Sequence, residues 1–373
     1  MKKNKKGVKL LGFAIGLLTG MACGVVLVAQ LDFDMPLWQY IGQLLIALLA
    51  FYAMIIVQVA IHEAGHLAAG LLSGYRFVSY RLFSLMWIRQ DGRIRLKRFS
   101  LAGTGGQCLM DPPDMQAGAL KTTLYNLGGV LANLLTAALA VGLSFCVQNA
   151  AACALLRMFA VVGFSSALIN GIPMRAISND GANALDVRRS EAARRAFWVQ
   201  LRVNAYMAQG VRLKDMPAEW FEMPADDALN DMPQAAMGVA ACNRLMDEMR
   251  FGEAQAQIEH MLDKATGLAQ IHRRLLILDE AYLRLLNGED VSELLDASTV
   301  AFMKQMADYP SVLRTRYARA LLQTCDRAAA EKLYARFDKV AARYPYPADI
   351  EAERALMDAA KAESDKRMEG ENS

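Results

Sequence analysis

The chain has 373 residues, of which 54% are hydrophobic and 21% are charged, and its formal net charge is +3. This length permits two or three ordinary domains. The six cysteines include no Cys-x-x-Cys pair, so the sequence does not indicate a disulfide scaffold.

Charge and hydropathy divide the chain into two regions. Residues 1–188 carry 16 Lys and Arg against 8 Asp and Glu, whereas the remaining residues carry 25 against 30. The first region contains long apolar runs, and roughly 20 apolar residues are enough to cross a bilayer as a helix. We therefore predict a transmembrane domain over residues 1–188, with spans at about residues 8–30, 37–73, 122–147 and 151–173.

The distribution of basic residues predicts how these spans are oriented. Residues 31–36 contain Asp32 and Asp34 and no basic residue, whereas residues 75–121 contain eight basic residues. Cytosolic loops of membrane proteins carry the excess of Lys and Arg, so we expect the second segment in the cytosol. Four spans then leave both termini in the cytosol. We expect a multi-pass protein of the cell membrane from a bacterial source.

The second predicted span contains a His-Glu-x-x-His motif, formed by His62, Glu63 and His66. Residues four apart on a helix share a face, so both imidazoles can reach one point with the Glu63 carboxylate beside them. Catalytic zinc takes three protein ligands and a water, and an adjacent Glu can remove a proton from that water. Ionisable groups in an apolar helix are costly and usually functional, which favours a metal site over two structural histidines.

A third ligand must come from elsewhere in the predicted membrane domain. Asp180 lies at the cytosolic end of the fourth span, where Pro173 should end or bend the helix. Asp180-Gly181 is a turn dipeptide that can direct the carboxylate back toward the membrane. Asn-Asp-Gly is also an ordinary turn sequence, so the spacing alone leaves this role open, and Asp186 is the alternative ligand.

Three further elements accompany the His-Glu-x-x-His motif: Gly-x-x-x-Asn in the third span, Asn-x-x-Pro in the fourth, and Asp-Gly after it. Their residues are Gly129, Asn133, Asn170, Pro173, Asp180 and Gly181. Together these motifs, within residues 36–187, resemble the site-2 protease (M50) family of intramembrane metalloproteases. The interval between Pro173 and Asp180 is longer than that family leads us to expect, and no segment has the length of an inserted PDZ domain.

The resemblance implies a set of residue roles and an activity. His62, His66 and Asp180 would ligate Zn²⁺, Glu63 would activate the water, and Asn133 and Asn170 would lie near the bound peptide. The expected reaction is hydrolysis of a membrane protein, such as a single-span protein, near the cytosolic boundary of the bilayer (regulated intramembrane proteolysis). The alternative is a catalytically inactive, membrane-anchored adaptor. We expect no nucleic acid partner.

Residues 84–99 predict a small cytosolic β-hairpin. Apolar and basic residues alternate on both sides of Asp91-Gly92, a strong signal for a two-residue turn. One face would carry Ile94 and Leu96, and the other would carry basic side chains. Such a hairpin can lie on anionic lipid headgroups, or its edge can hold an extended substrate by β-augmentation, and these two roles are compatible.

The amphipathic pattern after residue 188 predicts a soluble α-helical domain over residues 189–360, so the fold class is mainly α. Helices start in comparable ways at Gly252, Gly288 and Asp326, which are 36 and 38 residues apart. This spacing approaches the period of about 34 residues in tetratricopeptide arrays. Most signature residues of that repeat are missing, so we predict a repeat-like domain that binds a protein partner. Residues 361–373 are polar and predict a disordered tail.

Overall fold

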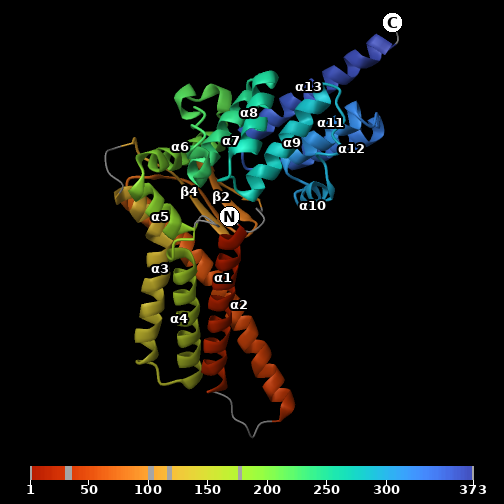
Figure 1. Ribbon diagram of the computed structural model, residues 1–373. Coiled ribbons are helices and arrows are strands. Elements are labelled where there is room, and N and C mark those ends of the chain that lie inside the picture. The colour runs from red at the N-terminus through yellow and green to blue at the C-terminus, as the bar shows by residue number, and fades with distance from the viewer. Residues whose placement is uncertain (1, 30–35, 100–104, 116–119, 175–178, 372–373) are drawn as a thin grey trace. The chain divides into compact units, whose positions relative to one another are not determined.

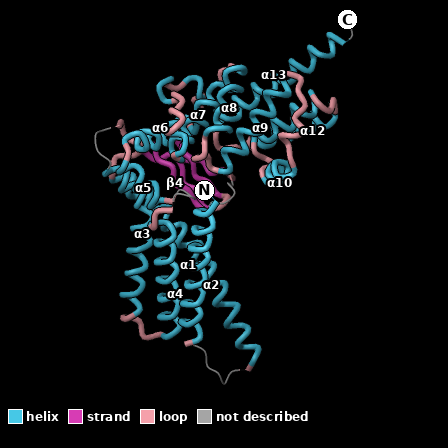
Figure 2. Tube along the Cα trace, in the orientation of Figure 1, coloured by secondary structure: helices cyan, strands magenta, loops and turns pink. Residues whose placement is uncertain are grey.

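The computed structural model describes residues 2–29, 36–99, 105–115, 120–174 and 179–371. These residues form thirteen α-helices and four β-strands (Figure 1), and the four strands make one small antiparallel sheet (Figure 2). The mainly α fold class is therefore confirmed. The chain divides into two compact units, Met1–Ser84 with Leu101–Arg194, and Leu85–Ser100 with Arg195–Ser373.

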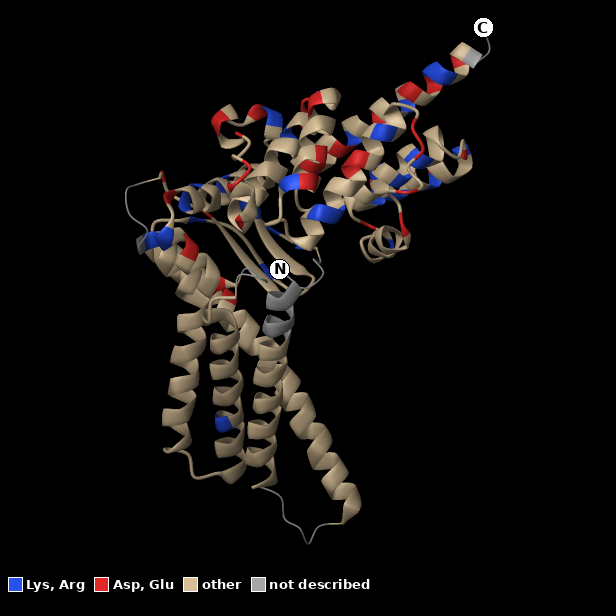
Figure 3. Cartoon of the chain, in the orientation of Figure 1, with Lys and Arg blue, Asp and Glu red and all other residues tan. Residues whose placement is uncertain are grey.

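Four helices of the first unit are long and apolar enough to cross a membrane. They are α1 (Lys2–Val28), α2 (Leu37–Leu72), α3 (Leu120–Ser144) and α4 (Ala150–Gly171). Their candidate spans, which in α1 cover Leu10–Val28, contain few charged residues (Figure 3), and large side chains such as Leu49 and Leu135 are exposed on them. A continuous exposed apolar surface of this kind is unfavourable in water. The prediction of four apolar spans is confirmed at this level.

Glycines allow the backbones of α2 and α3 to touch. A Cβ atom added to Gly65 of α2 would lie 2.3 Å from the backbone oxygen of Gly128 of α3, and one added to Gly128 would lie 2.5 Å from the backbone oxygen of Gly65. Small residues at a helix crossing permit this approach. Because His66 follows Gly65 directly, the crossing places the histidine motif of α2 against α3.

Strands β1 (Arg76–Leu82) and β4 (Gly106–Asp111) form an antiparallel pair in the first unit and pack against α2. Tyr80 is opposite Cys108, and Leu82 is opposite Gly106. The sequence analysis predicts only one hairpin, so the sheet is larger than expected. The paired strands are far apart in sequence, so no short turn links β1 to β4 and reveals the pairing.

Strands β2 (Leu85–Gln90) and β3 (Arg93–Arg98) form the predicted hairpin and belong to the second unit. Asp91 and Gly92 at its turn both have positive φ, 50° and 74°, as a tight two-residue turn of type I′ requires. The side-chain amide of Gln90 donates hydrogen bonds to the backbone oxygens of Ala208 and Pro345, at 3.3 and 2.8 Å. The hairpin is therefore attached to the helical part of its unit.

The helical part of the second unit consists mainly of seven helices after α6 (Glu191–Ala208). These are α7 (Met232–Asp247), α8 (Phe251–Lys264), α9 (Gln270–Leu286), α10 (Ala297–Gln305), α11 (Pro310–Leu322), α12 (Arg327–Ala341) and α13 (Pro347–Glu371). Helix α8 packs against α7 and α9, and α11 packs against α9, α12 and α13.

Two details of this unit differ from the sequence analysis. Gly288 follows the end of α9 with a φ of 83°, so it terminates one helix and does not begin another. The repeat-like organisation stays a prediction. Residues 361–371 are helical and belong to α13, whereas the sequence predicts a disordered tail there. Arg367 explains the difference, since its guanidinium contacts Glu363 at 2.9 Å and the backbone oxygen of Leu286 at 2.6 Å.

Candidate metal centre

Three side chains of the first unit direct one atom each to a common point. The Nε2 atoms of His62 and His66 lie 3.2 Å apart, and the Oδ2 atom of Asp180 lies 2.9 and 3.4 Å from them. A tetrahedral zinc ion with ligands at about 2.0–2.1 Å separates its ligand atoms by about 3.3 Å. The three atoms are therefore spaced to bind one ion. Asp186 is not part of this group.

The groups behind the imidazoles determine which ring nitrogen faces this point. His66 Nδ1 lies 2.8 Å from the backbone oxygen of Tyr125, which can only accept, so Nδ1 carries the proton. His62 Nδ1 lies 2.7 Å from Asn133 Oδ1. The Asn133 amide nitrogen donates to the backbone oxygen of Gln58 at 3.0 Å. The amide oxygen Oδ1 must therefore be the atom that faces His62. Each neutral imidazole therefore presents a bare Nε2.

No hydrogen atom lies among the three inward-facing atoms when both imidazoles are neutral. Asp180 Oδ2 is then a buried carboxylate oxygen without a hydrogen-bond donor. Two imidazoles and one carboxylate at this spacing could hold a metal ion, and they are a donor set that suits zinc.

Asp180 owes its position to Asn179. The structure shows that Asp180 begins helix α5 (Asp180–Arg189) and does not lie in the expected turn. The Asn179 amide donates to the backbone oxygens of Ile169 and Ile172, at 2.7 and 2.6 Å. Its Oδ1 atom accepts from the backbone of Met174 at 2.9 Å. The Asn179 side chain thus joins the end of α4 to the start of α5, and this fixes the position of Asp180.

Two glycines leave the space that the centre needs. A Cβ atom on Gly181 would lie 2.1 Å from the backbone oxygen of Gly171, so α5 can begin against the end of α4 only without a side chain there. A Cβ atom on Gly129 would lie 2.6 Å from Nε2 of His62. The Gly-x-x-x-Asn element therefore has a direct geometric meaning, in which the glycine leaves space for the His62 ring and the asparagine binds it.

The Glu63 side chain is 8% exposed and lies against the first residue of β4. A Cβ atom on Gly106 would come within 2.5 Å of Glu63 Oε1. The fully buried Arg81 donates hydrogen bonds to the backbone oxygens of Gly106 and Phe83, at 3.2 and 2.9 Å. The buried guanidinium of Arg81 thus fixes the start of β4, and Gly106 at this start confines the Glu63 carboxylate.

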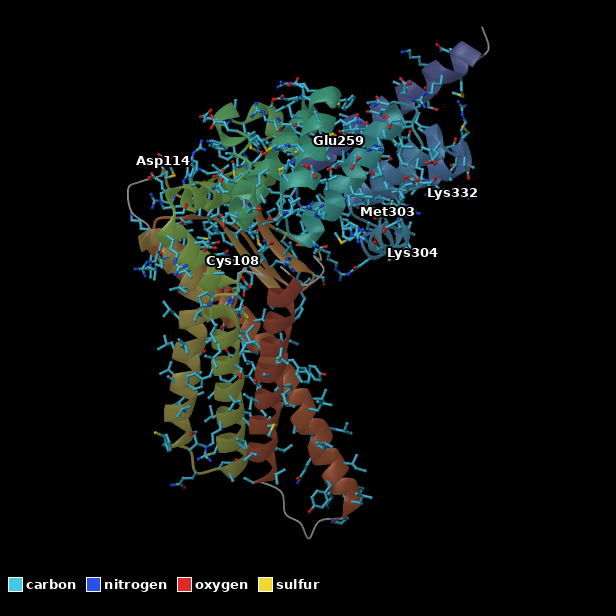
Figure 4. All side chains as sticks on the ribbon, viewed as in Figure 1. Cys108, Asp114, Glu259, Met303, Lys304 and Lys332 are labelled. Carbon is cyan, nitrogen blue, oxygen red and sulfur yellow. The ribbon has the colours of Figure 1, made fainter. Side chains whose placement is uncertain are left out.

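The paired residues Tyr80 and Cys108 lie near Glu63 but remain protonated. The Tyr80 hydroxyl donates to the backbone oxygen of Ala60 at 2.7 Å. Burial, then the charges of Glu63 and Cys108, raise the pKa of Tyr80 to about 12. Burial and the Glu63 charge also raise the pKa of the Cys108 thiol (labelled in Figure 4). Burial therefore favours the protonated thiol of Cys108 over the thiolate.

The two asparagines predicted to contact a peptide have different surroundings. Asn133 is fully buried and binds His62 and Gln58. Asn170 is half-buried, and its amide donates to the backbone oxygen of Ser166 on its own helix at 3.0 Å. Sequence reasoning missed Gln58, although a polar residue four positions before His62 in an apolar helix was a usable signal.

Comparisons of the chain with protein-family models, with curated proteins and with solved structures gave no match.

Proposed function

We propose that the protein is a zinc metalloendopeptidase of the site-2 protease type, which hydrolyses membrane-protein substrates near the cytosolic membrane boundary. The observation that carries the proposal is the convergence of one ligand atom each from His62, His66 and Asp180, beside Glu63. Two of these ligands and Glu63 belong to a helix that is long and apolar enough to cross a membrane. A carboxylate next to a two-histidine metal site is the arrangement that peptide hydrolysis requires.

Each residue then has a defined role. Zinc held by His62, His66 and Asp180 would lower the pKa of a bound water to about 7 and polarise the scissile carbonyl. Asn133 keeps the His62 ring in the tautomer that offers Nε2, and the Tyr125 backbone does the same for His66. Glu63, confined by the start of β4, accepts the proton from the attacking water and returns it to the leaving amine.

The length of α2 supports a reaction near one membrane boundary. From Leu37 to His62 the helix rises about 38 Å at 1.5 Å per residue, against a hydrocarbon core of about 30 Å. With ordinary tilt of α2, the metal centre lies at or near the membrane boundary opposite to Leu37. The basic residues between α2 and α3 favour a cytosolic location for that boundary, in a multi-pass protein of the cell membrane with both termini cytosolic.

Substituting Glu63→Gln in the purified, zinc-loaded protein tests the chemistry. Cleavage of a single-span membrane substrate should fall by roughly 10²–10⁴-fold, because a positioned general base contributes on that order. The zinc content should stay unchanged, and Glu293→Gln, at an exposed residue of the second unit, should cleave normally. Cleavage at the wild-type rate by Glu63→Gln would exclude the proposed role of this carboxylate.

Zinc analysis separates this proposal from the adaptor alternative. The wild-type protein should retain about one zinc per chain, as a site with three protein ligands predicts, and His62→Ala should retain none. A folded wild-type protein that binds no stoichiometric zinc would favour the membrane-anchored adaptor.

A further inference from the structure

The hairpin of β2 and β3 has two unlike faces. Side chains alternate along a strand, and residues paired across two strands share a face. One face contains Met86 and Ile88, which are fully buried, and Gln90, which binds backbone oxygens of the helical part. The opposite face, here called the outer face, is exposed. It consists of Leu85, Trp87, Arg89, Ile94, Leu96 and Arg98.

The outer face has an apolar centre with an arginine at each end. Trp87 pairs with Leu96 in the middle, and the arginines pair with Ile94 at the turn and with Leu85 at the open end. Ile94 and Leu96 are 63% and 60% exposed, and Leu85 and Trp87 are 39% and 36% exposed. Contiguous exposed apolar residues on a two-stranded hairpin indicate a contact surface.

The charge of the hairpin distinguishes the kinds of surface it can contact. Residues 85–99 contain five basic residues and one acidic residue, and that acid, Asp91, is paired with Arg95 at 2.9 Å. Arg89 and Arg98 belong to the outer face, which contains no acidic residue and therefore has a charge of +2; this charge does not favour an ordinary apolar protein face. An aromatic side chain flanked by arginines is instead suited to the boundary between hydrocarbon and anionic headgroups.

The chain itself keeps such a boundary within reach of the hairpin. Helix α2 ends at Leu72, and β2 begins at Leu85. Thirteen residues of fully extended chain span at most about 45 Å. If α2 crosses a membrane, the tether therefore keeps the hairpin within about 45 Å of Leu72, and binding to that membrane needs no free partner.

We propose that the outer face docks on anionic membrane lipid. Trp87, Ile94 and Leu96 enter the interfacial layer, while Arg89 and Arg98 contact lipid phosphates. This proposal depends on the membrane-spanning character of α1–α4 and is independent of the metal centre, so a loss of proteolysis leaves it intact.

Quenching of tryptophan fluorescence by brominated lipid measures the docking directly. The full-length protein and its Trp87→Phe variant are reconstituted in vesicles of phosphatidylcholine with or without phosphatidylglycerol, each containing brominated phosphatidylcholine. The difference between the two proteins reports Trp87. We expect this contribution to be quenched when phosphatidylglycerol is present and to recover at high salt, because the attraction is screened.

A charge-matched pair of variants tests the role of the arginines. Arg89→Gln with Arg98→Gln should lower the ratio of docked to undocked hairpin by about fivefold for each arginine, the factor that one basic residue contributes near an anionic surface. Lys304→Gln with Lys332→Gln removes the same charge from exposed positions on α10 and α12 (Figure 4) and should have no effect.

Three results would overturn the proposal. The first is that Trp87 is not quenched in anionic vesicles. The second is that the double lysine variant reduces quenching as much as the double arginine variant. Protection of Trp87 only when an acidic peptide is added would assign the outer face to a protein partner.

Discussion

Replacing Asn133 with alanine should weaken zinc binding without changing any ligand. The substitution removes the acceptor 2.7 Å from His62 Nδ1 and leaves that N–H, in a fully buried position, without its partner. The imidazole then loses the interaction that keeps its proton on Nδ1 and its lone pair on Nε2. Loss of such a supporting hydrogen bond costs about 10–100-fold in metal affinity, or roughly 1.4–2.7 kcal/mol.

Asn170→Ala is the matched control. Asn170 is also an asparagine of the first unit, but its amide donates a hydrogen bond to the backbone of its own helix. Its zinc affinity should therefore stay within about twofold of the wild type, since substitutions away from such features usually change free energies by less than about 0.5 kcal/mol. Competition with a fluorescent chelator in detergent measures all three affinities, and thermal unfolding of the metal-free proteins shows that each variant folds.

Two results would refute this reasoning. Equal zinc affinities for wild type and Asn133→Ala would show that the hydrogen bond does not control the tautomer of His62. Equal losses in the Asn133 and Asn170 variants would point to a general loosening of the helix bundle.

Two further predictions concern other parts of the molecule. Gly106→Ala should abolish cleavage while zinc content is retained, because its Cβ would displace the Glu63 carboxylate. Gly105→Ala should remain active, because the nearest atom to its added Cβ is 3.7 Å away. Loss of zinc from the Gly106 variant would contradict the predicted effect on Glu63 alone. Burial, partly offset by Arg314, raises the pKa of Glu353 from 4.5 to about 7. The folded state then holds a proton that the unfolded chain has released, so stability should fall by about 2–3 kcal/mol as the pH rises from about 4.5 to 7. Glu353→Gln should reduce this slope in hydrogen exchange of the second unit, and an unchanged slope would exclude the assignment.

Local rules were sufficient for several parts of the structure. The apolar runs predicted four helices of membrane-spanning length because a bilayer sets that length directly. The spacing of His62 and His66 placed both imidazoles on one face of α2 because the helical period is fixed by the backbone. The hairpin followed from Asp91-Gly92, whose positive φ angles suit a two-residue turn.

Long-range contacts decided the rest. Strands β1 and β4 pair across an inserted hairpin, and no local signal announces a pairing between distant segments. Helix α13 continues to Glu371 because Arg367 and its partners hold a polar segment that is too hydrophilic to order itself.

The candidate centre shows the same division. The amino-acid sequence supplied His62, Glu63 and His66 with their mutual geometry, but it left Asp180 and Asp186 as alternatives. Only the tertiary structure brings Asp180 to the two imidazoles, because its position depends on Asn179 joining α4 to α5. The tautomer of His62 likewise depends on Asn133, a residue on another helix. Helical period is a property of neighbouring residues, whereas the convergence of three lone pairs is a property of the packed bundle.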